Sequence, residues 1–236
     1  MITVLVPPGA RAVGERLAVD EEEAHHLRVR RVEDGAEVRF VDGAGAGGVA
    51  RLERAGKGPA LVIESMECRE RPPALVLAVG AGDRERFAWL VEKAAELGVT
   101  QVLPIETERT ASVATRVRDV HVEKLARRAR EAVKQSGAFW APVVEPPQQL
   151  ARFLARAVGT RLLLDAGGAS CGALAADEPV TALVGPEGGL TEGERAHVLS
   201  NGFRPVRVGP HVLRFETAAI AAATLIQAAR EGRRDG

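Results

Sequence analysis

The sequence predicts an α/β protein in which a doubly wound parallel sheet follows a small β-barrel domain. Short β-branched segments separated by turn residues fill roughly the first 70 positions. From residue 75 onward, apolar runs alternate with helical patterns, an alternation typical of a parallel sheet covered by helices. Between these regions lies the charged run Glu67-Cys-Arg-Glu-Arg-Pro-Pro73. We therefore expect two domains, at residues 1–71 and 74–236.

The N-terminal region is expected to hold one helix among several short strands. The helix is residues 21–29, with Asp20 as its N-cap and acidic side chains in its first turn, where they complement the helix dipole. Asp34-Gly35 and Asp42-Gly43 are typical turn sequences. The strands are expected at residues 3–7, 16–19, 37–41, 48–52 and 60–65.

The C-terminal region is expected to alternate strands and helices. Asp83 caps a helix that ends at Leu97, and Thr191 and Glu194 form a capping box for a helix that ends near Ser200. The other helices are expected at residues 119–135 and 216–230. The strands are expected at residues 75–79, 102–105, 161–164, 181–184 and 206–208.

Composition excludes several classes of protein. The 32 Lys and Arg residues balance the 32 Asp and Glu residues, which disfavours a generic binder of polyanions. The longest apolar runs, 74–79 and 218–226, are far shorter than the roughly 20 residues of a membrane span. Cys68 and Cys171 stand alone, without the spacing of metal ligands. We expect a cytoplasmic protein that uses no membrane and no metal.

The first glycine-rich segment, Gly43-Ala-Gly-Ala-Gly-Gly48, has the GxGxxG spacing of a dinucleotide-binding loop. The following segment, 49–55, would rise only ~10 Å as a helix, whereas a six-residue strand spans ~20 Å. Such a helix could not recross the sheet, so we interpret residues 43–48 as a hairpin loop. An oxidoreductase that uses this loop for a dinucleotide remains the alternative.

Two other segments leave apolar strands through Gly-Pro and enter helices. The first is Gly185-Pro-Glu-Gly-Gly189, and the second begins at Gly209-Pro210. Ligands of α/β proteins bind at the carboxyl ends of parallel strands, so a shared ligand cleft is the functional interpretation. The alternatives are ordinary βα turns and a surface ion pair between Arg214 and Glu216.

The segment 107–135 carries eight Arg or Lys residues against four Asp or Glu residues, although the whole chain is neutral. Arg127, Arg128, Arg130 and Lys134 lie on its helix, and Phe139-Trp140 follow. This pattern indicates contacts with RNA phosphates, or alternatively a solvated helical face.

Five motifs in this order resemble the RsmE family, the 16S rRNA (uridine-N3)-methyltransferases of the SPOUT superfamily. They are His25-His-Leu-Arg-Val-Arg30 with Asp34-Gly35, Glu92-Lys-Ala-Ala-Glu-Leu-Gly98, Thr107-Glu-Arg-Thr110, Gly185-Pro-Glu-Gly-Gly189 and Leu213-Arg-Phe-Glu-Thr-Ala218. The resemblance covers nearly the whole chain. It implies a PUA-like β-barrel, an α/β domain with a C-terminal trefoil knot, and a homodimer. It also implies S-adenosyl-L-methionine (SAM) as cofactor and, as substrate, uridine 1498 of the small ribosomal subunit.

Roles for individual residues follow from the resemblance, from the local charge and from the chemistry of the reaction. Arg109, Arg214 and Glu216 are the expected catalytic groups: Arg109 or Arg214 would stabilise the anion that develops on the uracil, and Glu216 would accept the N3 proton. The expected cofactor-binding residues are Leu164, Asp165, Val184, Gly185, Glu187, Gly189, Val208, Gly209, Leu213, Arg214, Thr217 and Ala218. The expected RNA-binding residues are Arg28, Arg30, Arg31, Arg127, Arg128 and Gln135.

The chain departs from the family pattern at three positions. The family motif Glu-Gln-Ser-Gly-Arg has Lys134 and Ala138 in place of its first and last residues, and Phe215 stands where Thr is common. A methyltransferase acting on another RNA and a non-catalytic assembly factor that binds rRNA are therefore the remaining alternatives.

Overall fold

A computed structural model describes residues 1–9, 11–54, 58–80, 82–170 and 178–232 of the chain. Cys171 lies outside these ranges. Contacts between Cα atoms divide the chain into two compact units. The first contains Met1–Arg71 together with Arg130–Ala141, and the second contains Pro72–Ala129 and Pro142–Gly236. The first unit thus takes a second segment from the middle of the sequence.

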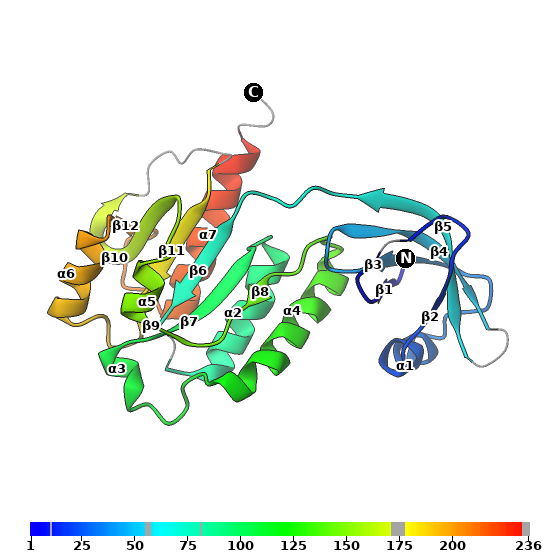
Figure 1. Ribbon diagram of the computed structural model, residues 1–236, viewed down its shortest axis with the longest axis horizontal. Helices are drawn as coiled ribbons and strands as arrows, with labels where there is room; N and C mark the ends of the chain where they lie inside the picture. Colours follow the sequence, from blue (N-terminus) through cyan, green and yellow to red (C-terminus); the bar gives the residue numbers. More distant parts are fainter. Residues whose placement is uncertain (10, 55–57, 81, 171–177, 233–236) are drawn as a thin grey trace. The chain divides into compact units, whose positions relative to one another are not determined.

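The first unit is built on a five-stranded sheet with the order β1-β3-β4-β5-β2 (Figure 1). Its strands are β1 (Thr3–Leu5), β2 (Arg16–Ala18), β3 (Glu37–Val41), β4 (Ala46–Glu53) and β5 (Ala60–Cys68). Strands β1 and β3 are parallel and the other neighbours are antiparallel. The described pairings do not join β1 to β2, so they do not by themselves close the sheet into a barrel.

Helix α1 (Glu21–Val29) begins where the sequence predicts, because the Asp20 side chain accepts a hydrogen bond from the Glu23 backbone N–H at 2.8 Å. Its Leu27 joins the apolar core of this unit, together with Phe40, Leu52 and Ile63 from the strands. The glycine-rich segment follows β3 as a hairpin, because β4 begins at Ala46 and runs antiparallel to β3. The hairpin interpretation is confirmed, and no helix follows the glycines.

The second unit holds a parallel sheet with the order β12-β10-β11-β6-β7-β8, and β9 pairs with β7 (Figure 1). The predicted parallel sheet is thus confirmed. Its strands are β6 (Leu75–Val79), β7 (Gln101–Glu106), β8 (Val143–Val144), β9 (Gln148–Gln149), β10 (Thr160–Ser170), β11 (Val180–Val184) and β12 (Arg204–Arg207). Its helices are α2 (Arg84–Glu96), α3 (Glu108–Ala111), α5 (Leu150–Leu154), α6 (Glu192–Ser200) and α7 (Phe215–Glu231).

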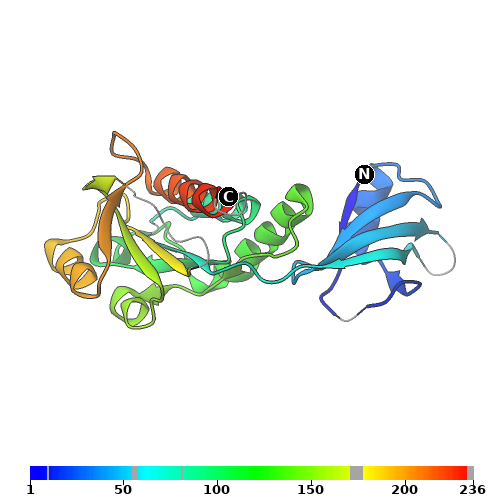
Figure 2. The same cartoon turned by 90° about the horizontal axis from the view of Figure 1, so that it is seen from above.

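Helices cover both faces of this sheet, as a doubly wound fold requires. Helices α5 and α6 pack Phe153 and Val198 against alternate strand residues such as Ala78 and Leu183. Helix α7 packs against β6, β10 and β11 and also contacts α2. Figure 2 shows α7, in red, and α6, in orange, on opposite sides of the strands. Apolar side chains on both faces explain why β6 and β11 are buried along their whole length.

Several boundaries differ from the prediction. The helix expected at residues 119–135 begins as a 3-10 turn (Asp119–His121) and continues as α4 (Val122–Ser136). Strand β12 ends at Arg207, so Val208 lies in the following loop rather than in the strand. The sequence did not predict α3, α5, β8 or β9, each only two to five residues long. Elements this short have too few residues to display a hydrophobic period.

Candidate functional site

A cavity of about 510 Å³ lies in the second unit beside the middle of β10 and at the carboxyl ends of β11 and β12. Because these strands are parallel and β10 lies between the other two, the loops that follow β11 and β12 meet at the same edge of the sheet, on either side of β10. The cavity is lined by Leu164 and Asp165 of β10, by the loop after β11 and by the loop after β12. The predicted cleft shared by the two Gly-Pro loops is therefore present.

The loop after β11 is held by its own backbone and by the helix that follows. The Gly189 N–H donates to the Pro186 carbonyl at 2.7 Å, and Gly189 has a φ of 73°, a conformation that favours glycine. Thr191 and Glu194 then form the predicted capping box of α6. This turn exposes backbone groups of Gly185 and Gly189 to the cavity.

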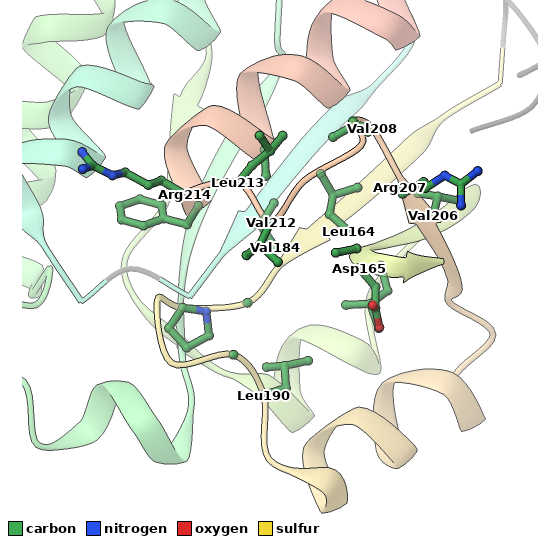
Figure 3. Close-up of a pocket in the computed structure, with 18 of the residues that line it drawn as sticks. Leu164, Asp165, Val184, Leu190, Val206, Arg207, Val208, Val212, Leu213 and Arg214 are labelled. Carbon is green, nitrogen blue, oxygen red and sulfur yellow. The ribbon is translucent and has the colours of Figure 1, made fainter. Parts of the chain in front are cut away.

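The walls of the cavity are largely apolar. Figure 3 shows Leu164, Val184 and Leu213 pointing toward one another between the two loops, whereas the guanidinium groups of Arg207 and Arg214 point in opposite directions. Apolar walls with nearby backbone N–H and C=O groups suit a flat heteroaromatic ligand, whose faces pack and whose edges form hydrogen bonds. The volume is in the usual range for small-molecule sites.

One charged pair stands at the edge of these walls. The Asp165 Oδ2 atom accepts from Nε of Arg195 at 3.0 Å, and Oδ1 accepts from the Gly167 backbone N–H at 2.8 Å. The pKa of Asp165 lies below its ordinary value. The hydrogen bond from Gly167 is the main cause and Arg195 lowers the pKa further, whereas burial acts in the opposite direction. Arg195 was not predicted from the sequence; it follows the capping-box residue Glu194 and also lines the cavity.

The predicted cofactor-binding residues gather at this cavity, with Thr217 as the exception. The lining contains Leu164, Asp165, Val184, Gly185, Glu187, Gly189, Val208, Gly209, Leu213, Arg214 and Ala218. Thr217 is exposed on α7 and is not among the lining residues. The lining also includes Leu190, His211 and Val212, which the sequence did not single out.

The predicted catalytic residues occupy three different environments. Arg109, on α3, donates from Nη1 to the Gly188 carbonyl, so it contacts the loop after β11 without lining the cavity. Arg214 is the exposed N-cap residue of α7 and lines the cavity. Glu216 is only 8% exposed, and its Oε2 atom has no hydrogen-bond partner within the described residues. A surface ion pair between Arg214 and Glu216 is therefore wrong, since the Glu216 side chain is buried.

The predicted RNA-binding residues lie in both units. Arg28, Arg30 and Arg31 are exposed at the C-terminal end of α1. Arg127 is exposed on α4, whereas Nε of Arg128 lies 3.0 Å from a Glu92 carboxylate oxygen. Gln135 is exposed in the last turn of α4. Arg128 is thus already paired with a carboxylate, which weakens its electrostatic attraction for phosphate.

The described residues contain neither a cluster of metal ligands nor a membrane-spanning helix. No group of three or more His, Cys, Asp or Glu side chains is arranged to hold a metal ion in the part of the chain that the structure describes. No helix in these residues is long and apolar enough to cross a membrane.

Comparison with known proteins gives concordant matches over the chain. Residues 69–227 match the family model of an RNA methyltransferase domain, and residues 19–65 match that of an RNA methyltransferase PUA domain. The ribosomal RNA small subunit methyltransferase E of Synechocystis is 30% identical over 88% of this chain and 71% of its own length. The Bacillus subtilis protein of the same name is 26% identical, with 89% and 88% covered.

Two solved structures are similar along nearly the whole chain. A ribosomal RNA small subunit methyltransferase E from Neisseria gonorrhoeae, bound to SAM, is 27% identical with a TM-score of 0.84. A Legionella pneumophila protein, also solved with SAM, is 30% identical with a TM-score of 0.83. Each alignment covers 97% of both chains.

Proposed function

We propose a reaction for this chain, which belongs to the ribosomal RNA small subunit methyltransferase E (RsmE) family. It methylates N3 of a uridine in 16S rRNA, with SAM as methyl donor. The target is the residue equivalent to uridine 1498. The observation that carries this proposal is the cavity beside β10 at the ends of β11 and β12, because its lining collects most of the residues that the family motifs indicate. The glycine-rich segment 43–48 is a hairpin, so it does not favour the dinucleotide-dependent oxidoreductase.

The lining fits SAM in shape and in chemistry. Leu164, Val184 and Leu213 provide apolar surfaces for an adenine ring, and the backbone of Gly185 and Gly209 is accessible for its polar edges. Asp165 supplies a carboxylate that can accept from ribose hydroxyls, and the Gly167 N–H and then Arg195 lower its pKa. When bound, SAM supplies a methyl group that its sulfonium already activates, so the protein needs no metal for this step.

Residues of this chain would accept the N3 proton of the uracil and stabilise the negative charge that develops on the ring. The N3 proton must leave, because the ring nitrogen has no free lone pair for the methyl group while it is protonated. Glu216 is the proposed acceptor, because it adjoins the cavity-lining Phe215 and its buried Oε2 has no hydrogen-bond partner within the described residues, although Glu216 itself is not among the lining residues. Arg214 and Arg109 would stabilise the negative charge that spreads to the carbonyl oxygens. Arg109 is held beside the loop after β11 by its contact with Gly188.

We assign the RNA-binding role to residues 1–71 as a PUA-like domain and the catalytic role to residues 74–236. Arg28, Arg30, Arg31, Arg127, Arg128 and Gln135 are the proposed RNA contacts. Exposed Trp89 on α2 and Leu225 on α7, two helices that contact each other, support a homodimer interface on that side of the sheet. The family relationship also supports a SPOUT-type trefoil knot in the C-terminal part and a cytoplasmic site of action.

Methyl transfer from labelled SAM tests this function directly. The substrate is a small ribosomal subunit that lacks rRNA base methylation, and the product is digested and examined by nucleoside mass spectrometry. We expect N3-methyluridine at one site. Transfer to another base would preserve the methyltransferase assignment and overturn the uridine assignment. SAM binding without transfer to any rRNA would favour the non-catalytic assembly factor, and absence of SAM binding would overturn the proposal.

A further inference from the structure

A cluster of arginines and aromatic rings in the first unit is not used by the proposed function. The segment after α4 returns to the sheet and places Phe139 and Trp140 against it, where Trp140 forms a β-bridge with Ala44. The Arg69 guanidinium carbon lies 4.3 Å from the Phe139 ring centroid, and that of Arg39 lies 5.5 Å from the same centroid. The corresponding distance from Arg71 to Trp140 is 5.6 Å.

The glycine-rich hairpin explains how these rings are accommodated. A Cβ atom at Gly45 would collide with the Trp140 ring, and one at Gly47 would lie 2.9 Å from Cε1 of Phe139. The indole Nε1 atom donates to the carbonyls of Arg69 and Glu70 at 3.0 and 3.1 Å. The glycines thus leave space for two aromatic side chains, and the indole is fixed by hydrogen bonds.

The guanidinium groups retain most of their hydrogen-bond donors. Arg39 uses Nη2 for the Gly137 carbonyl at 3.0 Å, and Arg69 uses Nε for Glu67 at 2.7 Å. Arg71 is exposed and has no carboxylate partner within the described residues. A guanidinium stacked on a ring has a restricted orientation while its N–H edges stay available, which lowers the entropic cost of binding an oxygen anion.

We propose that Arg39, Arg69 and Arg71, stacked on Phe139 and Trp140, form a binding site for the phosphate backbone of RNA. Phosphate groups accept paired hydrogen bonds from guanidinium edges, and the half-buried indole offers a surface to a neighbouring base. The site directly adjoins the Gln135-Ser-Gly137 motif, because Arg39 binds the Gly137 carbonyl. The choice of RNA as ligand rests on the proposed function, whereas the site itself rests on these contacts.

The sequence contains two tryptophans, which provides a local probe. In a Trp89→Phe variant, Trp140 is the only source of indole emission. A fluorescein-labelled, mixed-sequence single-stranded RNA of about 20 nucleotides is titrated without SAM, and anisotropy gives its Kd. An unlabelled RNA of the same sequence is titrated in parallel to follow Trp140 emission. We expect Trp140 emission to change and to saturate at the Kd that anisotropy reports.

Arginine variants then test the charges. Arg71→Ala and Arg69→Ala should each weaken binding and reduce the slope of log Kd against log salt by about 0.7, the value for one phosphate contact with a single strand. Arg51→Ala is the matched control, since both terminal nitrogens of Arg51 are already used, Nη2 by Glu64 at 2.6 Å and Nη1 by the Gly35 carbonyl at 2.8 Å, whereas Arg69 uses only Nε within the described residues. It should leave the Kd and the slope unchanged.

Two results would overturn this site. One is Trp140 emission that stays constant while anisotropy shows saturated RNA, and the other is Arg71→Ala and Arg69→Ala variants that behave like Arg51→Ala. Circular dichroism of each variant checks that it is folded. Because binding is measured without cofactor or turnover, a failure of methyl transfer leaves this test valid. Likewise, a loss of this site would leave the methyltransferase assignment intact.

Discussion

Nζ of Lys134 lies 2.6 Å from Oε1 of Glu23, and the two side chains are only 10% and 4% exposed. This ion pair joins the last turn of α4 to α1 inside the first unit. It gives a physical reason for the lysine at a position where the resemblance predicts glutamate, since a second carboxylate there would face Glu23. Burial nevertheless raises the pKa of Glu23, an effect that the Lys134 hydrogen bond only partly offsets.

Breaking this pair from one side should destabilise the protein strongly. Lys134→Met leaves the Glu23 carboxylate buried without its cation, a change that costs about 3–5 kcal/mol in comparable buried pairs. The double variant Glu23→Leu/Lys134→Met should recover most of that loss, because no uncompensated charge remains. Urea unfolding monitored by circular dichroism measures both free energies of unfolding. A Lys134→Met variant as stable as the parent would show that the pair contributes little.

Asp165 and Glu23 should change the pH dependence of the unfolding free energy in opposite directions, because folding lowers the pKa of Asp165 and raises that of Glu23. The pKa of Asp165 is lowered from 3.8 in the folded state, so its contribution to stability is fully present above that value. As pH falls through the lowered pKa, the folded carboxylate becomes protonated and the contribution is lost. The difference in unfolding free energy between the parent and Asp165→Asn should therefore be constant near pH 7 and narrow below about pH 3.8.

Urea unfolding at a series of pH values measures this difference. Glu192→Gln, at an exposed position in the first turn of α6, is a control for general acid effects. A difference that widens as pH falls would contradict the assigned sign.

Local chemistry determines which parts of this fold were predictable. Asp20, Asp83 and Thr191 cap their helices within three residues of the groups they bind, so the sequence alone located these helix starts. The Lys134–Glu23 pair joins positions 111 residues apart, and the Asp165–Arg195 pair joins positions 30 apart. No periodicity reports contacts of that separation, because they exist only after the chain has folded.

The functional site likewise has features that the sequence predicted and features that depend on the folded structure. The two Gly-Pro exits predicted a shared cleft because parallel strands place their carboxyl ends at one edge, a rule that needs no coordinates. The burial of Glu216 was not accessible in this way. Its position in the first turn of α7 was evident, but whether that turn faces solvent depends on how α7 packs on the sheet.

Arg214 is expected to contribute more to the rate of methyl transfer than to the affinity for SAM. It lines the cavity, yet its guanidinium points away from the apolar walls formed by Leu164, Val184 and Leu213. Arg214→Ala should therefore lower turnover by roughly 10²-fold, the usual effect of removing one group that stabilises developing charge. The Kd for SAM, measured by calorimetry, should stay within a few-fold of the parent.

Arg204→Ala is the matched control for this experiment, because Arg204 is an exposed arginine of β12 that is not among the residues lining the cavity. It should retain parental turnover. Equal losses in the two variants, or turnover of Arg214→Ala at the parental level, would remove Arg214 from the proposed chemistry.

Glu216→Gln tests the proposed proton acceptor, because glutamine has nearly the same shape but cannot be ionised. The side chain is buried in the first turn of α7 and its Oε2 atom lacks a hydrogen-bond partner within the described residues, so the substitution changes charge more than packing. We expect turnover to fall by roughly 10²–10⁴-fold, the usual range for loss of a general base, while the Kd for SAM is unchanged. The Kd for SAM and the circular dichroism spectrum separate this role from a structural one, since loss of the acceptor lowers turnover alone, whereas a packing defect also weakens SAM binding or alters the spectrum. Parental turnover in Glu216→Gln would assign the proton to another group.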